Sequence, residues 1–440
     1  MPSSITIENE DVEPLNASFV LFKIYLLVLG LWFSIGFSKG IMKLLSVDPE
    51  SLPPGPRGLP LIGNELQIPR DKQWLCFDRW SKQYGDIISI SSFGQTSIIL
   101  SSAQAALDLL ETKGNIYSDR PRVVMAGELV GWDQGLGYSR YGERFKEFRR
   151  MFHQTLGPRS IQDLYGLQET ETHKLLLRIH RDPISFIDHA RQSSGSMILK
   201  LAYGYTAKEE NDPMSVCTTC PSISWSHRCE DYIPSFTSSY LLEDNGPSQD
   251  LVKAAAASLY SGGAETTPSS ITSFILAMAL YPDVQAKGQN EIDLLLKGKR
   301  LPKSSDRDSL PYVNAIVKEV LRWNPSIPLG LPHRAMQDDE YREFLIKEGT
   351  ILWANIWSIL HDETKICPGM HLADNSIFLA VSSILAVFNI RKTTGHLGEI
   401  IDPIVDYSGF ISHPRPFQCV IEVRSKEADS LICHEMVSET

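Results

Sequence analysis

The sequence has little that points to a nucleic-acid-binding protein or to a secreted protein stabilised by disulfides. Its 42 basic residues are outnumbered by 53 acidic ones, which gives a formal net charge of -11, and no basic tract stands out. Nucleic acid is therefore not an expected partner. The seven cysteines are an odd number scattered over 440 residues, so no disulfide framework is expected and a reducing compartment fits better.

One long apolar run predicts a membrane anchor. Residues 1–18 are polar and acidic, whereas residues 19–38 are apolar except for Lys23. A helix of this length is about long enough for a hydrocarbon core of ~30 Å. Lys39 and Lys43 follow the run, which places residues 1–18 in the lumen and the large C-terminal part in the cytosol. A signal peptide is the alternative, but no basic region precedes the run and no Ala-x-Ala site follows it.

A linker, residues 39–64, follows the anchor and ends in the proline-rich segment 52–64, which predicts a stiff hinge. Beyond it, residues 74–84 predict a helix that ends at Gly85. Residues 87–90 and 97–100 predict a β-hairpin around Phe93-Gly94-Gln95.

The middle of the chain shows two different patterns. Residues 160–204 read as helical, but from 212 to 246 prolines and serines recur and no helical period survives. Cys217, Cys220 and Cys229 offer a zinc-binding alternative for this part. Structural zinc sites usually place paired ligands across a longer loop, so an irregular loop is the preferred interpretation.

Residues 248–281 predict one long helix that contains two glycines and two threonines, at 262–267. Glycine inside a helix costs roughly 1 kcal/mol relative to alanine, so a flat ligand or a local widening for O₂ or water is expected there. A simple close helix crossing is the alternative. Pro268 predicts a kink one residue beyond this segment.

Three further patterns follow. Glu319 and Arg322 share one face of an apolar helix, although any surface helix can contain such a pair. Residues 346–355 then predict a pair of strands, and residues 353–361 predict the next helix.

Cys367 stands directly before Pro-Gly and ahead of an apolar helical run, 377–388. A helix N-terminus favours a thiolate, which suits an iron ion, whereas a buried free cysteine is the alternative for this motif alone.

In this order, the segments resemble the microsomal cytochrome P450 family. The hinge 52–64 resembles the family's proline hinge. Residues 262–267 match its Ala/Gly-Gly-x-Asp/Glu-Thr-Thr motif, and residues 319–322 match Glu-x-x-Arg. The run 367–374 looks most like fungal members that act in secondary metabolism or on xenobiotics. The resemblance covers roughly residues 15–425.

The resemblance implies catalytic roles for two residues and an iron ligand. Cys367 would be the thiolate ligand of the iron of heme b. Thr266 would donate or relay protons to the oxygen that is being activated, and Glu265 would support that relay. Gly263 would allow the cofactor to approach the helix backbone closely.

The resemblance also implies residues that hold the cofactor. Arg149 and Arg334 would bind heme propionates, with His333 beside Arg334 in the same cofactor-binding segment. Phe145 stands where the family has a tryptophan that shares this task with the arginine. Glu319 and Arg322 would form a buried bidentate pair that supports the heme side of the core.

The chain departs from the family in two places. Near 212–247 most of the helices that roof the family's substrate pocket are missing. Near 360–365 the approach to the cysteine is altered, since Leu360, Glu363 and Lys365 stand where the family has Phe, Gly and Arg. Skipped exons or a faulty gene model would produce such gaps.

The expected fold is therefore mainly α with a small β-sheet region, an incomplete cytochrome P450 fold preceded by one transmembrane helix. Residues 65–425 would form the catalytic domain and residues 426–440 a tail. The implied reaction inserts one oxygen atom of O₂ into an apolar small molecule, with electrons from NADPH-cytochrome P450 reductase at the endoplasmic reticulum membrane. The alternatives are a catalytically impaired or inactive membrane-anchored remnant and a zinc-binding adaptor.

Overall fold

The computed structural model describes residues 25, 28–30, 52–157, 159–208, 235–241, 246–361, 371–395 and 398–434. Residues 1–52 and 342–344 form one unit, and residues 53–341 and 345–440 form the other. In the first unit, Tyr25, Val28 and Leu29 are helical and exposed. The search for membrane spans covered the described residues alone and found no helix of sufficient length and apolarity. Most of the predicted anchor, residues 19–38, lies outside them.

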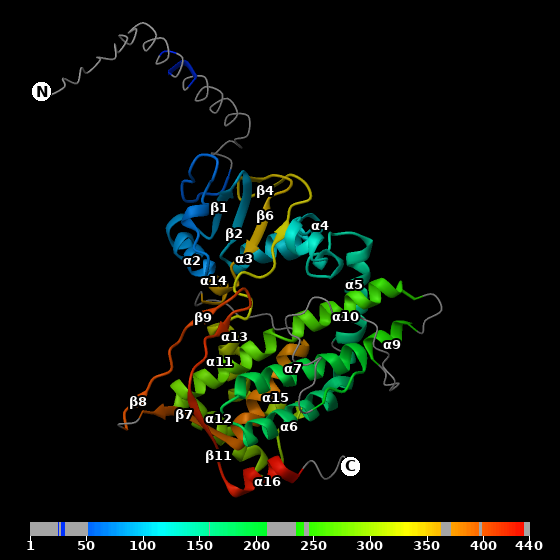
Figure 1. Cartoon of the computed structure of the whole chain (residues 1–440), viewed down its shortest axis with the longest axis vertical. Helices are drawn as coiled ribbons and strands as arrows, with labels where there is room; N and C mark the ends of the chain where they lie inside the picture. Colours follow the sequence, from blue (N-terminus) through cyan, green and yellow to red (C-terminus); the bar gives the residue numbers. More distant parts are fainter. Residues whose placement is uncertain are drawn as a thin grey trace, which may run out of the picture. The chain divides into compact units, whose positions relative to one another are not determined.

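The larger unit is mainly helical, as the sequence predicts, with small sheets (Figure 1). Its longer helices are α2 (Gln73–Tyr84), α5 (Glu143–Leu156), α6 (Tyr165–Arg181), α7 (Phe186–Tyr203), α10 (Gln249–Gly263), α11 (Thr266–Leu280), α12 (Pro282–Leu296), α13 (Pro311–Trp323), α15 (His371–Val387) and α16 (Lys426–His434). The shorter ones are α3 (Ala103–Ala106), α4 (Gly114–Tyr117), α9 (Phe236–Leu241) and α14 (Ile356–His361). Short 3-10 and π segments are η2 (Glu65–Gln67), η3 (Leu107–Thr112), η4 (Val124–Leu129), η5 (Trp132–Gln134), η6 (Ser160–Leu164) and η7 (Ser304–Ser309).

A four-stranded sheet of order β1-β2-β6-β3 lies near the N-terminal part of this unit. Its strands are β1 (Ile87–Ser92), β2 (Gln95–Leu100), β3 (His333–Arg334) and β6 (Ile351–Ala354). β1 and β2 form the predicted antiparallel hairpin, and β6 joins β2 in parallel with Ser97 opposite Ile351. Since Ile88, Ile98 and Ile99 are fully buried, both faces of the hairpin are covered.

The predicted pairing of two strands within residues 346–355 is wrong. β6 pairs with β2 and β3, whereas β5 (Phe344–Ile346) is ordered next to β4 (Asp339–Tyr341). The apolar alternation of 351–354 fits any sheet neighbour, so the sequence could not specify which one. The remaining strands are β7 (Phe388–Thr394), β8 (Ile400–Ile401), β9 (Tyr407–Ser408), β10 (His413–Pro414) and β11 (Cys419–Val423).

The core is built around two helices, α11 and α15, which are buried on nearly every side. Phe274, Ile275 and Phe378 are fully buried in one cluster that also contains side chains of α6, α12, α13, β7 and α16. Figure 1 shows α6, α7, α11 and α15 gathered in one helical bundle. A helix that is buried on every side requires neighbours on every side, which these elements supply.

The predicted single helix over residues 248–281 is broken. α10 ends at Gly263 and α11 begins at Thr266, with Ala264 and Glu265 in a turn between them. Pro268 has no backbone N–H to give to the carbonyl of Ala264, and its ring disfavours a continuous helix there. The break therefore falls before the proline, inside the predicted motif.

The proline-rich hinge is packed against β1. The backbone N–H of Ser89 donates to Pro54 (3.1 Å), and a Cβ at Gly55 would lie 2.0 Å from the Ser89 carbonyl oxygen. Gly63, at φ +71°, makes an isolated bridge to Ser92. These glycines let the chain lie close to the strand.

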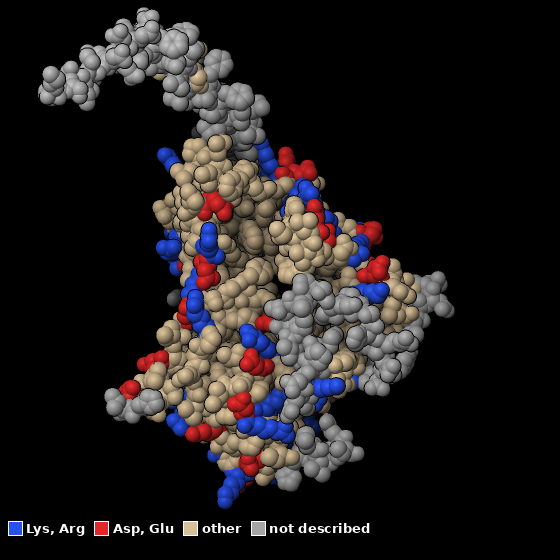
Figure 2. All heavy atoms as spheres, in the orientation of Figure 1, with Lys and Arg blue, Asp and Glu red and all other residues tan. Residues whose placement is uncertain are grey.

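Charged side chains of both signs are interspersed on the face seen in Figure 2. Among the described residues, exposed ion pairs include Arg391 with Glu422 (2.8 Å) and Lys146 with Glu143 (2.9 Å). Exposed pairs of this kind stabilise the fold by about 0–1 kcal/mol each.

Candidate heme site

Thr266 is the first residue of α11 and lies at the break between the two helices. Its hydroxyl donates to the carbonyl of Gly262 at 2.8 Å. Its own carbonyl accepts a hydrogen bond from the Ser326 hydroxyl at 3.0 Å. The side chain thus occupies the hydrogen-bonding position that an unbroken helix would fill with a backbone N–H.

Glu265 lies in the turn, near one histidine and one arginine side chain. Its Oε2 is 3.1 Å from Nε2 of His413 and 3.8 Å from Nε of Arg191. The hydrogen bond from His413 and the charge of Arg191 lower the pKa of Glu265, against the effect of burial. The carboxylate is therefore ionised at neutral pH, and its stabilising contacts are lost as the pH falls through that lowered pKa.

The two glycines of α10 differ in their surroundings. A Cβ at Gly263 would lie 2.7 Å from Cδ1 of Ile198, so Gly263 allows α10 to pack closely on α7. A Cβ at Gly262 would meet nothing within 4 Å, and Gly262 is exposed. Close helix packing accounts for Gly263, and its predicted contact with a cofactor stays a prediction.

Asp119 organises a group of cationic side chains at the sheet edge. Its Oδ2 accepts from Arg334 at 3.0 Å and from Arg140 at 3.2 Å, and its carbonyl accepts from the backbone N–H of Arg334 at 2.8 Å. Asp119 is buried at 5% exposure. The structure thus brings Arg334, the predicted propionate ligand on β3, beside the loop that follows α4.

Arg120, the next residue, is half-buried. Its Nη1 donates to the carbonyls of Leu331 (3.2 Å) and Pro332 (2.7 Å), and its Nε is a buried donor that has no partner among the described residues. Burial lowers the pKa of Arg120 to about 10, and the charge of Arg149 on α5 lowers it further, while Asp119 opposes both. Arg149 itself is exposed. The charge of Arg149 thus acts on Arg120, and Arg334 contacts Asp119, the residue directly before Arg120.

His333 is held in its neutral form. Its Nδ1 lies 2.8 Å from the carbonyl of Tyr117, and burial together with the charge of Arg120 lowers its pKa to about 4. Because the partner is a carbonyl, Nδ1 carries the proton and Nε2 is an acceptor at neutral pH. The predicted part of His333 in cofactor binding stays a prediction.

Glu319 and Arg322 form the predicted bidentate pair, with N–O distances of 2.7 and 2.6 Å. The prediction that this pair is buried is wrong, because the two side chains are 60% and 37% exposed. The charge of Arg322 is one of the causes that lower the pKa of the neighbouring His361, after burial. The residues from 362 to 370, which precede α15, lie outside the described residues.

Cys367 is among them, so the structure describes neither the predicted thiolate nor Pro368-Gly369. It does describe how the first turns of α15 are held. Gln168 of α6 donates to the carbonyl of Leu372 (3.1 Å) and to Ser376 (2.7 Å). Asn375 donates to Oε1 of Gln168 at 2.6 Å.

Segment η7 fixes the same end of α15 from the other side. The amide of Asn375 donates to the hydroxyl of Ser304 at 3.0 Å, and Arg307 pairs with Asp374 at 2.6 Å. Buried, mutually satisfied polar groups of this kind favour one arrangement. The helix that follows the predicted ligand is therefore fixed in place by side chains distant in sequence.

The described residues around Arg120 are suited to a cofactor that carries carboxylate groups. The half-buried guanidinium of Arg120, whose Nε donor has no partner among the described residues, suits a carboxylate. A cavity of about 300 Å³ exists elsewhere in the described part of the chain, between α6 and α15, and no predicted site residue lines it. The predicted contacts of Arg149 and Arg334 with heme propionates stay predictions.

Comparison with known proteins decides the family. The model of the Cytochrome P450 family matches residues 53–190 and 224–365. The chain belongs to the cytochrome P450 family. Cytochrome P450 monooxygenase 208 of Postia placenta is 40% identical over 87% of this chain and 92% of its own length. Cytochrome P450 monooxygenase claR of Ampulloclitocybe clavipes is 35% identical, over 87% and 88% of the two chains.

Membership makes the chain a P450 enzyme by family and implies a heme iron, O₂, a redox partner and a small-molecule substrate. The alignment with monooxygenase 208 runs over 471 positions, more than the 440 residues of this P450, so this chain must contain gaps relative to it. The family match is also interrupted between residues 190 and 224.

Sequence reasoning missed three partners of the predicted residues in this P450. Arg120 lies in Asp119-Arg120-Pro121, and its only signal was an arginine directly before a proline near a predicted propionate segment. Asp119 and His413 had no signal of their own, since their partners are distant in sequence, such as Arg334 and Glu265.

Proposed function

We propose that this chain is a heme–thiolate monooxygenase in which Cys367 ligates the iron and Arg120, Arg149 and Arg334 hold the propionates. The substrate would be an apolar small molecule of fungal secondary metabolism. The observation that carries the proposal is the buried Nε of Arg120, which lacks an acceptor among the described residues and follows Asp119, the partner of Arg334. A buried donor without a partner costs about 1–3 kcal/mol, which a bound carboxylate would recover.

The bound heme supplies O₂ activation, in which one oxygen atom enters a C–H bond and the other leaves as water, with two electrons and two protons consumed. Thr266 and Glu265 would serve proton delivery. The hydroxyl of Thr266 donates to Gly262, so its lone pairs are available to accept a proton that it then passes on. Glu265 is ionised, and its Oε2 lies 3.1 Å from Nε2 of His413.

We further propose that the electrons come from NADPH-cytochrome P450 reductase at the endoplasmic reticulum membrane. Support comes from the apolar run 19–38 and from Lys39 and Lys43 after it, which favour a single-pass anchor with a cytosolic catalytic domain. The exposed, helical Tyr25, Val28 and Leu29 lie within this run.

The test is the absorption spectrum of the purified, reduced, CO-bound protein. Wild type should show the Soret band at the long-wavelength position typical of thiolate ligation, because a thiolate donates electron density to the iron. Cys367→Ala should lose that position, whereas Cys419→Ala, at another free cysteine, is the control and should keep it. Identical spectra for wild type and Cys367→Ala would reject the proposed ligand.

A catalytically impaired or inactive membrane-anchored P450 is the second candidate. It is favoured by the gaps that the alignment opens in this chain and by the end of the family match at residue 365, before Cys367. Stoichiometric heme with no thiolate-type CO band, or no heme at all, would support this candidate over the first.

A further inference from the structure

The C-terminal helix α16 is anchored on α6 by more than apolar contacts. Ala428 and Ile432 are buried in the main core cluster. The ring Nε2 of His173, on α6, lies 2.9 Å from the carbonyl of Ile432. The two helices are therefore held side by side, and the residues at their exposed seam have defined neighbours.

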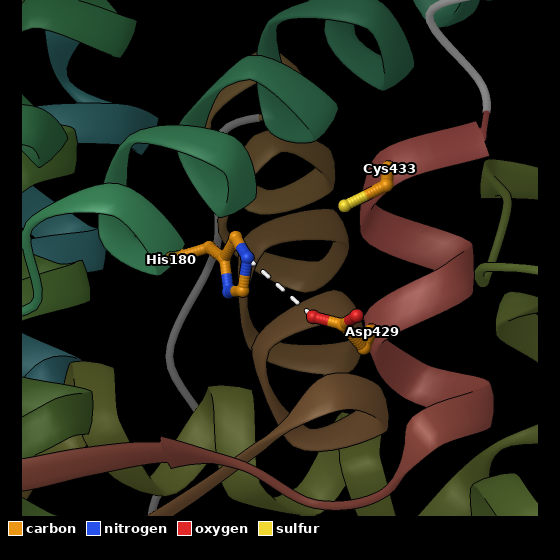
Figure 3. Close-up of side chains that lie close together, drawn as sticks. All are labelled: His180, Asp429 and Cys433. Carbon is orange, nitrogen blue, oxygen red and sulfur yellow. Dashed lines mark ion pairs between the residues drawn. The ribbon is translucent and has the colours of Figure 1, made fainter.

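Three potential metal ligands meet at this seam. His180 comes from the last turn of α6, while Asp429 and Cys433 are one turn apart on α16 (Figure 3). Their ligand atoms all lie within 4.8 Å of one another, and Nε2 of His180 is 3.5 Å from Oδ1 of Asp429. The i, i+4 spacing on α16 puts the carboxylate and the thiol on the same face.

The set differs from an ordinary surface ion pair because it includes a sulfur. We propose that His180, Asp429 and Cys433 bind a zinc ion that joins α16 to α6. Imidazole, carboxylate and thiolate are all zinc ligands, and sulfur disfavours Mg²⁺ and Ca²⁺. Binding would deprotonate the Cys433 thiol, with the proton released to solvent, and would leave the three ligands and Zn²⁺ with no net charge.

Zinc binding requires only small movements of the three side chains. Metal–ligand distances of about 2.0–2.3 Å in a tetrahedral site put ligand atoms roughly 3.3–3.8 Å apart. The His180–Asp429 separation of 3.5 Å is already in that range. Asp429 and Cys433 are exposed, so their side chains can rotate to close the remaining gap, and water can take the fourth position.

Helix polarity favours a cation at this point. His180 is one residue from the C-terminus of α6, and Cys433 is one residue from the C-terminus of α16. The unpaired carbonyls at helix C-termini carry partial negative charge, which stabilises a bound cation. The proposed site is separate from the heme site, and its test does not depend on activity.

The first experiment measures zinc binding by the full-length, chelator-treated protein with calorimetry and X-ray absorption at the zinc edge. We expect one zinc per chain with a single sulfur at about 2.3 Å. Cys433→Ala should remove that sulfur signal, and His180→Ala and Asp429→Asn should each weaken binding at least tenfold. Glu427→Gln, an exposed acid on the same helix, is the matched control and should leave binding unchanged.

A second measurement needs no variant at the seam. Zinc should slow alkylation of Cys433 by iodoacetamide at least tenfold, as read by mass spectrometry of the wild-type chain. The double variant Cys217→Ser, Cys220→Ser controls for the other cysteine-rich segment and should keep the zinc–sulfur signal. The proposal is rejected if Cys433 reacts equally fast with zinc, or if the signal depends on Cys217 and Cys220.

Discussion

At the residue scale, Arg120 links the described structure most directly to the cofactor. It combines partial burial, two hydrogen bonds to carbonyls of the segment 331–332 and one buried donor with no partner among the described residues. Arg140 contacts the same Asp119 but is 52% exposed. Comparing variants of Arg120 and Arg140 therefore separates the loss of a proposed cofactor ligand from a change in local charge.

We expect Arg120→Leu to accelerate heme loss about tenfold or more. A hydrogen bond to a charged group contributes about 1.5–3 kcal/mol, and this substitution removes the guanidinium. The measurement is the rate of heme transfer to apomyoglobin. Arg140→Leu is the control and should change the rate less than twofold. Equal rates for wild type and Arg120→Leu would contradict the assignment, and urea unfolding of the heme-free proteins separates heme loss from lost stability.

The predicted residues could be named because family motifs are local in sequence. Arg334, Glu319 and Arg322, the partner of Glu319, follow from a few neighbouring letters, but Asp119, the partner of Arg334, does not. Asp119 is more than two hundred positions from Arg334. Its role depends on the tertiary fold, since any buried aspartate requires a partner that the sequence does not specify.

At the scale of elements, the close crossing of α10 and α7 restricts which residue the chain accepts at position 263. The atoms that a Cβ at Gly263 would meet are Cδ1 and Cγ1 of Ile198, both at 2.7 Å. Gly262, next to it, faces open space. Substitutions at Gly262 and Gly263 therefore compare the effect of helix propensity with the effect of close packing in the same helix.

We expect Gly263→Ala to lower the free energy of unfolding by about 1–3 kcal/mol, because it overpacks the crossing. Gly262→Ala should instead raise it by roughly 0.5–1 kcal/mol through higher helix propensity. Chemical denaturation measures both. Adding Ile198→Ala to Gly263→Ala should restore part of the loss. If Gly263→Ala is as stable as Gly262→Ala, the close approach is not a constraint.

Helices with a clear period were predictable, and their interruptions were less so. The helix predicted at 74–84 is α2, one residue longer at its start. The 248–281 run looked continuous because its composition is helical throughout, and Pro268 indicated only a kink. The break at 264–265 reflects a proline, two glycines and the contacts of Thr266 and Glu265 acting together.

At the scale of the whole molecule, the sequence predicts that residues 19–38 decide whether the chain is bound to a membrane. We expect the full chain to float with microsomal membranes and to resist alkaline carbonate extraction, because a helix of about 20 apolar residues spans a bilayer. Removal of residues 1–38 should release it fully. Removal of residues 1–18 alone is the control and should leave it bound. Release by the shorter truncation would contradict the predicted span.

The parallel pairing of β2 with β6 also has a consequence for biosynthesis. The side-chain amide of Gln95 on β2 donates a hydrogen bond to the carbonyl of Gly349, 254 positions later and just before β6. At about 5–20 residues per second, a ribosome needs roughly 13–50 s to synthesise that interval. During this time the newly made β1–β2 hairpin presents an unpaired edge to other nascent chains and to chaperones. Translation speed across the middle of the chain therefore determines how long that edge stays exposed.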